Sequence, residues 1–181
     1  AESTVTLGNL DDLEGTNLHI LGKTYYVVEA RSGTADHVGK LTLLDNVVVS
    51  NVEEGGSLTT VNVGDKSYVV STFLIGPSSV TLDINGESLD INGERVSFPY
   101  PNLMPKRLSD GSYISIGDVY HIGLAGEINH ADFVIARNKL ELGHGQDIKL
   151  NDDTIVGIKA YMPKGTSTSS NEKLDKIVIE W

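Results

Sequence analysis

Residues Val80-Thr-Leu-Asp-Ile-Asn-Gly-Glu-Ser-Leu-Asp-Ile-Asn-Gly-Glu-Arg-Val-Ser-Phe98 carry the clearest fold signal in this chain. Apolar and polar residues alternate along the stretch, and Asn-Gly occurs at 85–86 and again at 92–93. Asn-Gly between alternating runs is typical of a two-residue β-hairpin loop, because both loop positions require a positive φ. The stretch therefore predicts a three-stranded β-meander.

Two-residue loops also fix the register of the expected meander. Leu82 should lie opposite Leu89, and Leu89 opposite Val96, so that both turns agree on one apolar face. On the other face we expect Asp90 to pair with Arg95 across the strands. The apolar face then consists of Leu82, Ile84, Leu89, Ile91, Val96 and Phe98.

Similar period-two alternation, punctuated by Gly, Asn and Asp, continues on both sides of this stretch and predicts about a dozen short strands. We expect strands at 23–30, 41–44, 47–52, 58–63, 67–75, 112–116, 119–122, 131–136, 139–142, 148–150, 154–161 and 173–181. Strands at this spacing predict an all-β fold, an antiparallel β-sandwich of Ig-like or jelly-roll-like type. We expect one domain over 1–181, with the proline-rich segment 99–112 as the place where two small modules would divide.

Composition excludes several classes of protein. The chain has 181 residues, no cysteine and a formal net charge of −11. Disulfides and thiolate zinc sites are therefore impossible, and a nucleic-acid partner is disfavoured because phosphate binding needs clustered cations. No run of 18 apolar residues exists, so no membrane span is expected. The chain opens Ala1-Glu-Ser3, which favours a secreted protein after signal cleavage over a boundary chosen for expression.

Motifs for chemistry are weak. His121, His130 and His144 could meet in space, but no helical metal spacing links them, so we expect no metal site and no catalytic residues. Asp83 and Asp90 share a strand face; a solvated face is favoured over a calcium site, and weak calcium binding is the most we expect. Aromatic residues that could bind carbohydrate are Tyr25, Tyr26 and Tyr100, although core packing is the simpler interpretation.

The first residues suggest a route to assembly. Glu2–Leu7 alternates, with Val5 and Leu7 on one face, and Gly8-Asn9 follows as a hinge. Such a strand can close its own sheet, or it can pair with the open edge of a neighbouring copy and fill pockets there with Val5 and Leu7.

One family resemblance is carried by the pattern Leu21-Gly-Lys-Thr-Tyr-Tyr-Val-Val28, followed by Lys40-Leu-Thr-Leu-Leu44. It resembles a hairpin of archaeal S-layer proteins, in which the return strand reads Lys-Leu-x-Leu. The segments 53–58 and 147–155 are also similar to that family's β-repeats. The chain departs from the family in being short and in lacking N-glycosylation sequons. The resemblance implies an extracellular, cell-surface structural protein without catalysis.

Together these observations predict a secreted, non-catalytic subunit that forms homo-oligomers through β-strand edges, as a surface layer or a pilus-like filament. A carbohydrate- or protein-binding β-sandwich module is the alternative.

Overall fold

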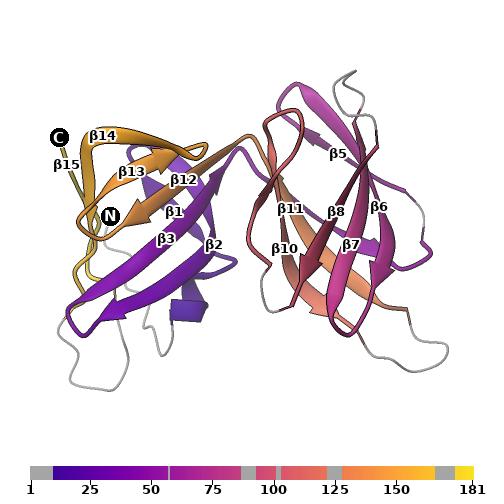
Figure 1. Cartoon of the computed structure of the whole chain (residues 1–181), viewed down its shortest axis with the longest axis horizontal. Helices are drawn as coiled ribbons and strands as arrows, with labels where there is room; N and C mark the ends of the chain where they lie inside the picture. Colours follow the sequence, from indigo (N-terminus) through magenta and orange to yellow (C-terminus); the bar gives the residue numbers. More distant parts are fainter. Residues whose placement is uncertain (1–9, 57, 87–92, 101–102, 122–127, 166–173) are drawn as a thin grey trace. The chain divides into compact units, whose positions relative to one another are not determined.

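The computed structural model describes residues 10–56, 58–86, 93–100, 103–121, 128–165 and 174–181. These residues form β-strands in antiparallel sheets, and their only helical element is one 3-10 turn, η1 (Leu10–Leu13), shown in Figure 1. The predicted all-β class is confirmed. The described part of the chain contains no helix that is long and apolar enough to cross a membrane.

The chain divides into two compact units, and the division is not at 99–112. Unit 1 comprises Ala1–Asp45 and Asn138–Trp181, and unit 2 is the intervening segment Asn46–Arg137. The proline-rich segment lies inside unit 2. Unit 2 is therefore an insertion into unit 1, and sequence composition gives no sign of the two crossing points.

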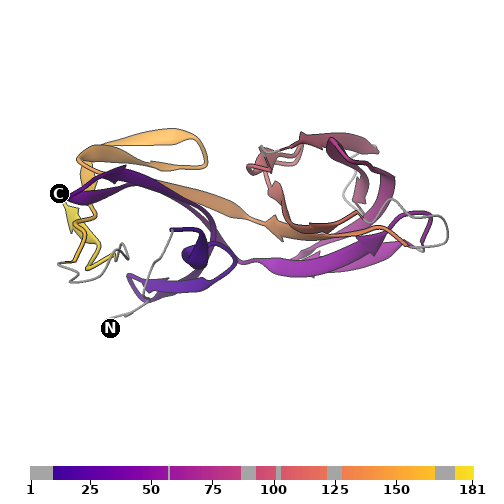
Figure 2. The same cartoon turned by 90° about the horizontal axis from the view of Figure 1, so that it is seen from below.

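Unit 1 is one seven-stranded antiparallel sheet in the order β1-β2-β3-β12-β13-β14-β15, which curls like half a barrel (Figure 2). Its strands are β1 (Asn17–Ile20), β2 (Lys23–Thr34), β3 (His37–Asp45), β12 (Asn138–Gly143), β13 (Gln146–Leu150), β14 (Asp153–Tyr161) and β15 (Val178–Glu180). Alternate side chains of the sheet, joined by Leu10 and Leu13 of η1, form its buried apolar core.

Unit 2 is a sandwich of two four-stranded sheets, in the orders β4-β11-β10-β9 and β5-β6-β7-β8. Its strands are β4 (Val48–Glu53), β5 (Thr59–Val63), β6 (Lys66–Ile75), β7 (Ser79–Gly86), β8 (Glu94–Pro99), β9 (Lys106–Arg107), β10 (Tyr113–Tyr120) and β11 (His130–Ala136). Both sheets contribute to one buried core, in which Phe98 and Phe133 are fully buried. Because two sheets share one core, unit 2 has the predicted sandwich architecture.

The three-stranded meander predicted over 80–98 is wrong in its register. Leu82 pairs with Val96 on one side and with Thr72 of β6 on the other, so Leu89 has no place beside it. Asn85 and Gly86 continue β7 instead of forming a hairpin loop, and residues 87–92 lie outside the described residues. The apolar face is nevertheless as predicted for the residues described, because direct pairing of Leu82 with Val96 puts both side chains on the same side of the sheet.

Candidate functional site

The sheet of unit 1 ends in two strands that each have a neighbour on one side only among the described residues. These strands are β1, which pairs with β2, and β15, which pairs with β14. Both border a single cavity of about 590 Å³, which we call the seam groove. The seam groove is lined by Asn17, Leu18, His19, Ile20, Leu21, Leu174, Asp175, Lys176, Ile177, Ile179 and Trp181.

The floor of the seam groove is apolar because both strands alternate. Leu18 and Ile20 lie two residues apart on β1, and Ile177 and Ile179 lie two apart in and before β15. In a strand such pairs project to the same side of the sheet. Leu18 is buried in the core of unit 1, while the three isoleucines are only partly buried and pack against that core. The groove therefore opens directly onto the hydrophobic core.

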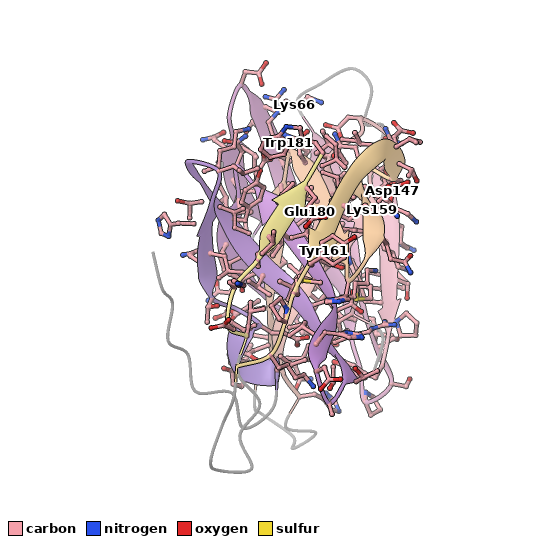
Figure 3. All side chains as sticks on the ribbon, turned by 90° about the vertical axis from the view of Figure 1, so that its left-hand side faces the viewer. Lys66, Asp147, Lys159, Tyr161, Glu180 and Trp181 are labelled. Atoms are coloured by element: carbon pink, nitrogen blue, oxygen red, sulfur yellow. The ribbon has the colours of Figure 1, made fainter. Side chains whose placement is uncertain are left out.

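Two large apolar side chains on the rim are exposed to solvent. Leu21 is 76% exposed and Trp181 is 89% exposed. In Figure 3 Trp181 lies just beyond the end of β15, which runs beside β14. Leu21 also has a φ of 51°, in the left-handed region that a leucine rarely adopts. The rim thus combines backbone strain with apolar exposure, neither of which helps the unit to fold by itself.

A second cavity of about 240 Å³ shares Ile20, Leu21 and Ile179 with the seam groove. The polar groups at this cavity include Asp45 and Asn138, and Asn138 Nδ2 donates to Asp45 Oδ1 at 2.8 Å. The remaining lining is Lys23, Tyr25, Leu140, Leu142, Ile148, Leu150 and Ile155. Apolar walls with a few polar groups are the usual make-up of a small-molecule site.

The three tyrosines named as carbohydrate candidates do not gather into a platform. Tyr25 lines the second cavity, and Tyr26, the next residue of β2, projects to the opposite face. Tyr100 belongs to unit 2, where it packs against the core and its buried hydroxyl has no hydrogen-bond partner among the described residues. Burial raises the pKa of Tyr100. Tyr25 is thus the one of the three that lines the second cavity.

A ladder of charges crosses the central strands of unit 1. Lys40 Nζ lies 2.6 Å from Glu141 Oε1 and 3.4 Å from Glu29 Oε2, and Lys139 contacts Glu141 and Asp152. Burial lowers the pKa of Lys40, but its hydrogen bond with Glu141 and the charge of Glu29 outweigh burial and leave the pKa raised. Burial raises the pKa of Glu141, but Lys40 and Lys139 outweigh it and leave the pKa lowered. Because these charges alternate in sign, the ladder stabilises the sheet.

The strongest electrostatic cluster of unit 2 surrounds Asp110, whose side chain is 1% exposed. Asp110 Oδ2 accepts hydrogen bonds from Lys66 Nζ and Tyr68 OH, both at 2.7 Å, and Oδ1 accepts from Ser112 N and Oγ. Burial raises the pKa of Asp110, but these hydrogen bonds outweigh it and hold the pKa at about 2. Burial also raises the pKa of Tyr68 to about 12. Both carboxylate oxygens are occupied, so the cluster is structural.

Three of the five histidines lie in stacked ring pairs. The His144 ring lies on that of His37, with centroids 3.9 Å apart, and His130 stacks on Tyr120 at 4.3 Å. The described residues contain no group of three or more His, Cys, Asp or Glu side chains that could hold a metal ion.

The acidic strand face considered for calcium is engaged in another way. Arg95 pairs with Asp83, with Nε–Oδ1 and Nη2–Oδ2 distances of 2.6 and 2.9 Å. The hydrogen bond from Arg95 lowers the pKa of Asp83. The guanidinium of Arg95 also covers the ring of Phe73, 3.6 Å from its centroid. Asp90 lies outside the described residues.

The proposed assembly residues Val5 and Leu7 also lie outside the described residues. The sequence predicted a strand over 173–181, which contains β15, but β1 on the other border of the seam groove was missed. The signal was present as Leu18-His-Ile20, followed directly by Leu21-Gly22. Neither protein-family models nor curated proteins give a match to this chain.

Proposed function

We propose that this chain is a non-catalytic structural subunit that associates with copies of itself into a cell-surface layer or a pilus-like filament outside the cell. The observation that carries the proposal is in the sheet of unit 1, where β1 and β15, its edge strands among the described residues, border one apolar groove. Open sheet edges promote pairing with another chain, because their outward backbone N–H and C=O groups are unpaired.

The sequence supports the same proposal. Glu2–Leu7 has the alternation of a strand that can add to such an edge. The segment that resembles archaeal S-layer proteins forms β2 and β3, which pair with Tyr26 opposite Leu44 and Arg31 opposite Lys40. A cysteine-free, acidic chain also suits an extracellular structural role, in which solubility depends on net charge.

The test is negative-stain electron microscopy and light scattering on the full chain over a range of concentrations. We expect sheets or filaments, and a scattering mass that rises with concentration and with added salt, because salt screens the repulsion between copies of net charge −11. A protein that stays monomeric at several milligrams per millilitre, with or without salt, would contradict the proposal.

The second cavity favours one alternative function, a carbohydrate-binding module. It offers Tyr25 as a stacking surface beside the polar pair Asp45 and Asn138. Titration calorimetry with neutral oligosaccharides separates the two functions. A binding module gives saturable heats that Tyr25→Ala abolishes, whereas Tyr26→Ala, on the opposite face of β2, leaves them unchanged.

A further inference from the structure

Resting on the proposed self-association, we propose that the seam groove receives the segment Glu2–Leu7 of a second copy, as an additional strand between β1 and β15. The proposal identifies the acceptor surface, its occupant and the side chains through which the two copies meet.

The backbone of the two bordering strands favours insertion of a further strand. Both strands that border the seam groove are edge strands among the described residues, so an inserted strand can form main-chain hydrogen bonds on either of its sides. One insertion would then protect two open edges at once. A strand added to an edge of either sheet of unit 2 would cover only one open edge. The seam groove is therefore the more favourable acceptor for a strand.

The spacing of apolar side chains in the seam groove matches their spacing in Glu2–Leu7. The groove presents apolar side chains two residues apart on each bordering strand: Leu18 and Ile20 on one, Ile177 and Ile179 on the other. Glu2–Leu7 carries Val5 and Leu7 with the same spacing, and Thr4 and Thr6 on its other face. A strand in the groove therefore places both apolar residues on the core and both threonines toward solvent.

Charge also favours the seam groove as the place where two copies meet. The chain as a whole is strongly acidic, so two copies repel each other over most of their surface. Glu2 is the only charged side chain in the segment, and in the seam groove the charges of Lys176 and Asp175 offset each other. The exposed Leu21 and Trp181 on the rim supply the apolar surface that the incoming strand would cover.

The test uses full-length variants, each of which disables either the donor segment or the acceptor groove. The donor-defective protein carries Val5→Lys and Leu7→Lys, and the acceptor-defective protein carries Ile179→Lys. Leu21→Lys is a second acceptor variant whose exposed side chain spares the fold, should Ile179→Lys fail to fold. The matched control is Val156→Lys, an 83% exposed apolar residue on β14 that lines neither cavity.

Each defective protein should be monomeric by size-exclusion chromatography with light scattering, while the control assembles like the parent. A one-to-one mixture of donor-defective and acceptor-defective proteins should form heterodimers and nothing larger, because each pair retains one intact donor and one intact acceptor. A labelled peptide of residues 1–9 should bind the donor-defective protein, and the same peptide with both lysines should not.

Three results would overturn the proposal. If the parent assembles and the acceptor variants assemble equally well, copies join elsewhere and the self-association proposed above still stands. If the parent is monomeric and the peptide does not bind, both proposals fail. If the parent is monomeric but the donor-defective protein binds the peptide, the segment closes its own groove and not that of a second copy.

Discussion

At the scale of single residues, Asp110 shows how one carboxylate joins the two sheets of unit 2. Lys66 and Tyr68 belong to β6 in one sheet, while Ser112 directly precedes β10 in the other. All three donate to Asp110, which is buried and ionised. Removing one partner from such a cluster costs more than a surface ion pair contributes, because the remaining groups stay buried.

We predict that Asp110→Asn lowers the free energy of unfolding at neutral pH by about 2 kcal/mol. Because the pKa of Asp110 is lower in the folded state, its carboxylate stabilises the fold fully above the pKa of the unfolded state. This stabilisation is lost as the pH falls toward about 2. The difference between parent and variant, measured by urea denaturation, should therefore narrow below about pH 4. The control is Asp65→Asn. Asp65 is 77% exposed and pairs with Arg137, so this variant should change the free energy of unfolding little. Parallel pH profiles for parent and Asp110→Asn would refute the assignment.

Gly93 offers a second prediction at this scale. Its φ is 56°, and a Cβ there would meet no atom of the described residues within 4 Å, so the expected cost of substitution is backbone strain. Gly93→Val should destabilise the protein by about 1–2 kcal/mol, and Gly93→Asn by clearly less, because asparagine tolerates this conformation. Thermal melts of the three proteins check the order. Equal melting temperatures for the valine and asparagine variants would mean that residue 93 does not require a positive φ.

At the scale of elements, the β1–β2 hairpin is where folding and the proposed assembly would make opposite demands. Its two-residue loop, Leu21-Gly22, has positive φ at both positions, 51° and 77°, and Ile20 pairs with Lys23. Asparagine or glycine is the usual first residue of such a loop. Leucine there is strained and exposed, which is expected where a side chain is retained for binding and not for stability.

We therefore predict that Leu21→Asn stabilises the monomer by about 1 kcal/mol, or a few degrees in melting temperature, while weakening self-association. Calorimetry at low concentration measures the first effect, and light scattering at high concentration the second. A variant that is less stable than the parent would show that Leu21 contributes to the fold of unit 1.

Elements also show where sequence reasoning succeeds and where it fails. The alternation of apolar and polar residues correctly predicted a strand over Lys23–Ala30, which lies in β2, and the apolar face of β7 and β8. It succeeds because a sheet that buries one face needs an apolar residue at every second position. It failed on the partner of Leu82, because a meander and a single hairpin put the same residues on the same face. The seam groove could not be predicted, since it depends on how far a seven-stranded sheet curls, which is a property of its packing and twist.

At the scale of the whole molecule, unit 2 interrupts unit 1 at a point that the backbone can easily rejoin. Asp45 and Asn138 are paired across β3 and β12, and Val48 and Ile135 are paired just inside unit 2. The two ends of the insertion thus lie side by side. Each unit has its own buried core, so each has what an independent domain needs.

We predict that residues 46–137 fold alone, and that unit 1 folds when Asp45 and Asn138 are joined by Asn-Gly. A two-residue loop suits this junction because the flanking residues already face each other in an antiparallel pair. Circular dichroism and denaturant melts should show one cooperative transition for each piece. If either piece is unfolded, the units depend on each other for stability and the chain folds as a single body.

The measurement that tests the assembly account most directly is the emission of Trp181, the single tryptophan of the chain, followed with light scattering as protein concentration rises. Trp181 lines the seam groove and is 89% exposed, so a strand that enters the groove must shield it from water. The account predicts a blue shift that follows the rise in scattering and is absent from the Val5→Lys, Leu7→Lys protein. Scattering that rises while the emission maximum stays fixed would contradict it.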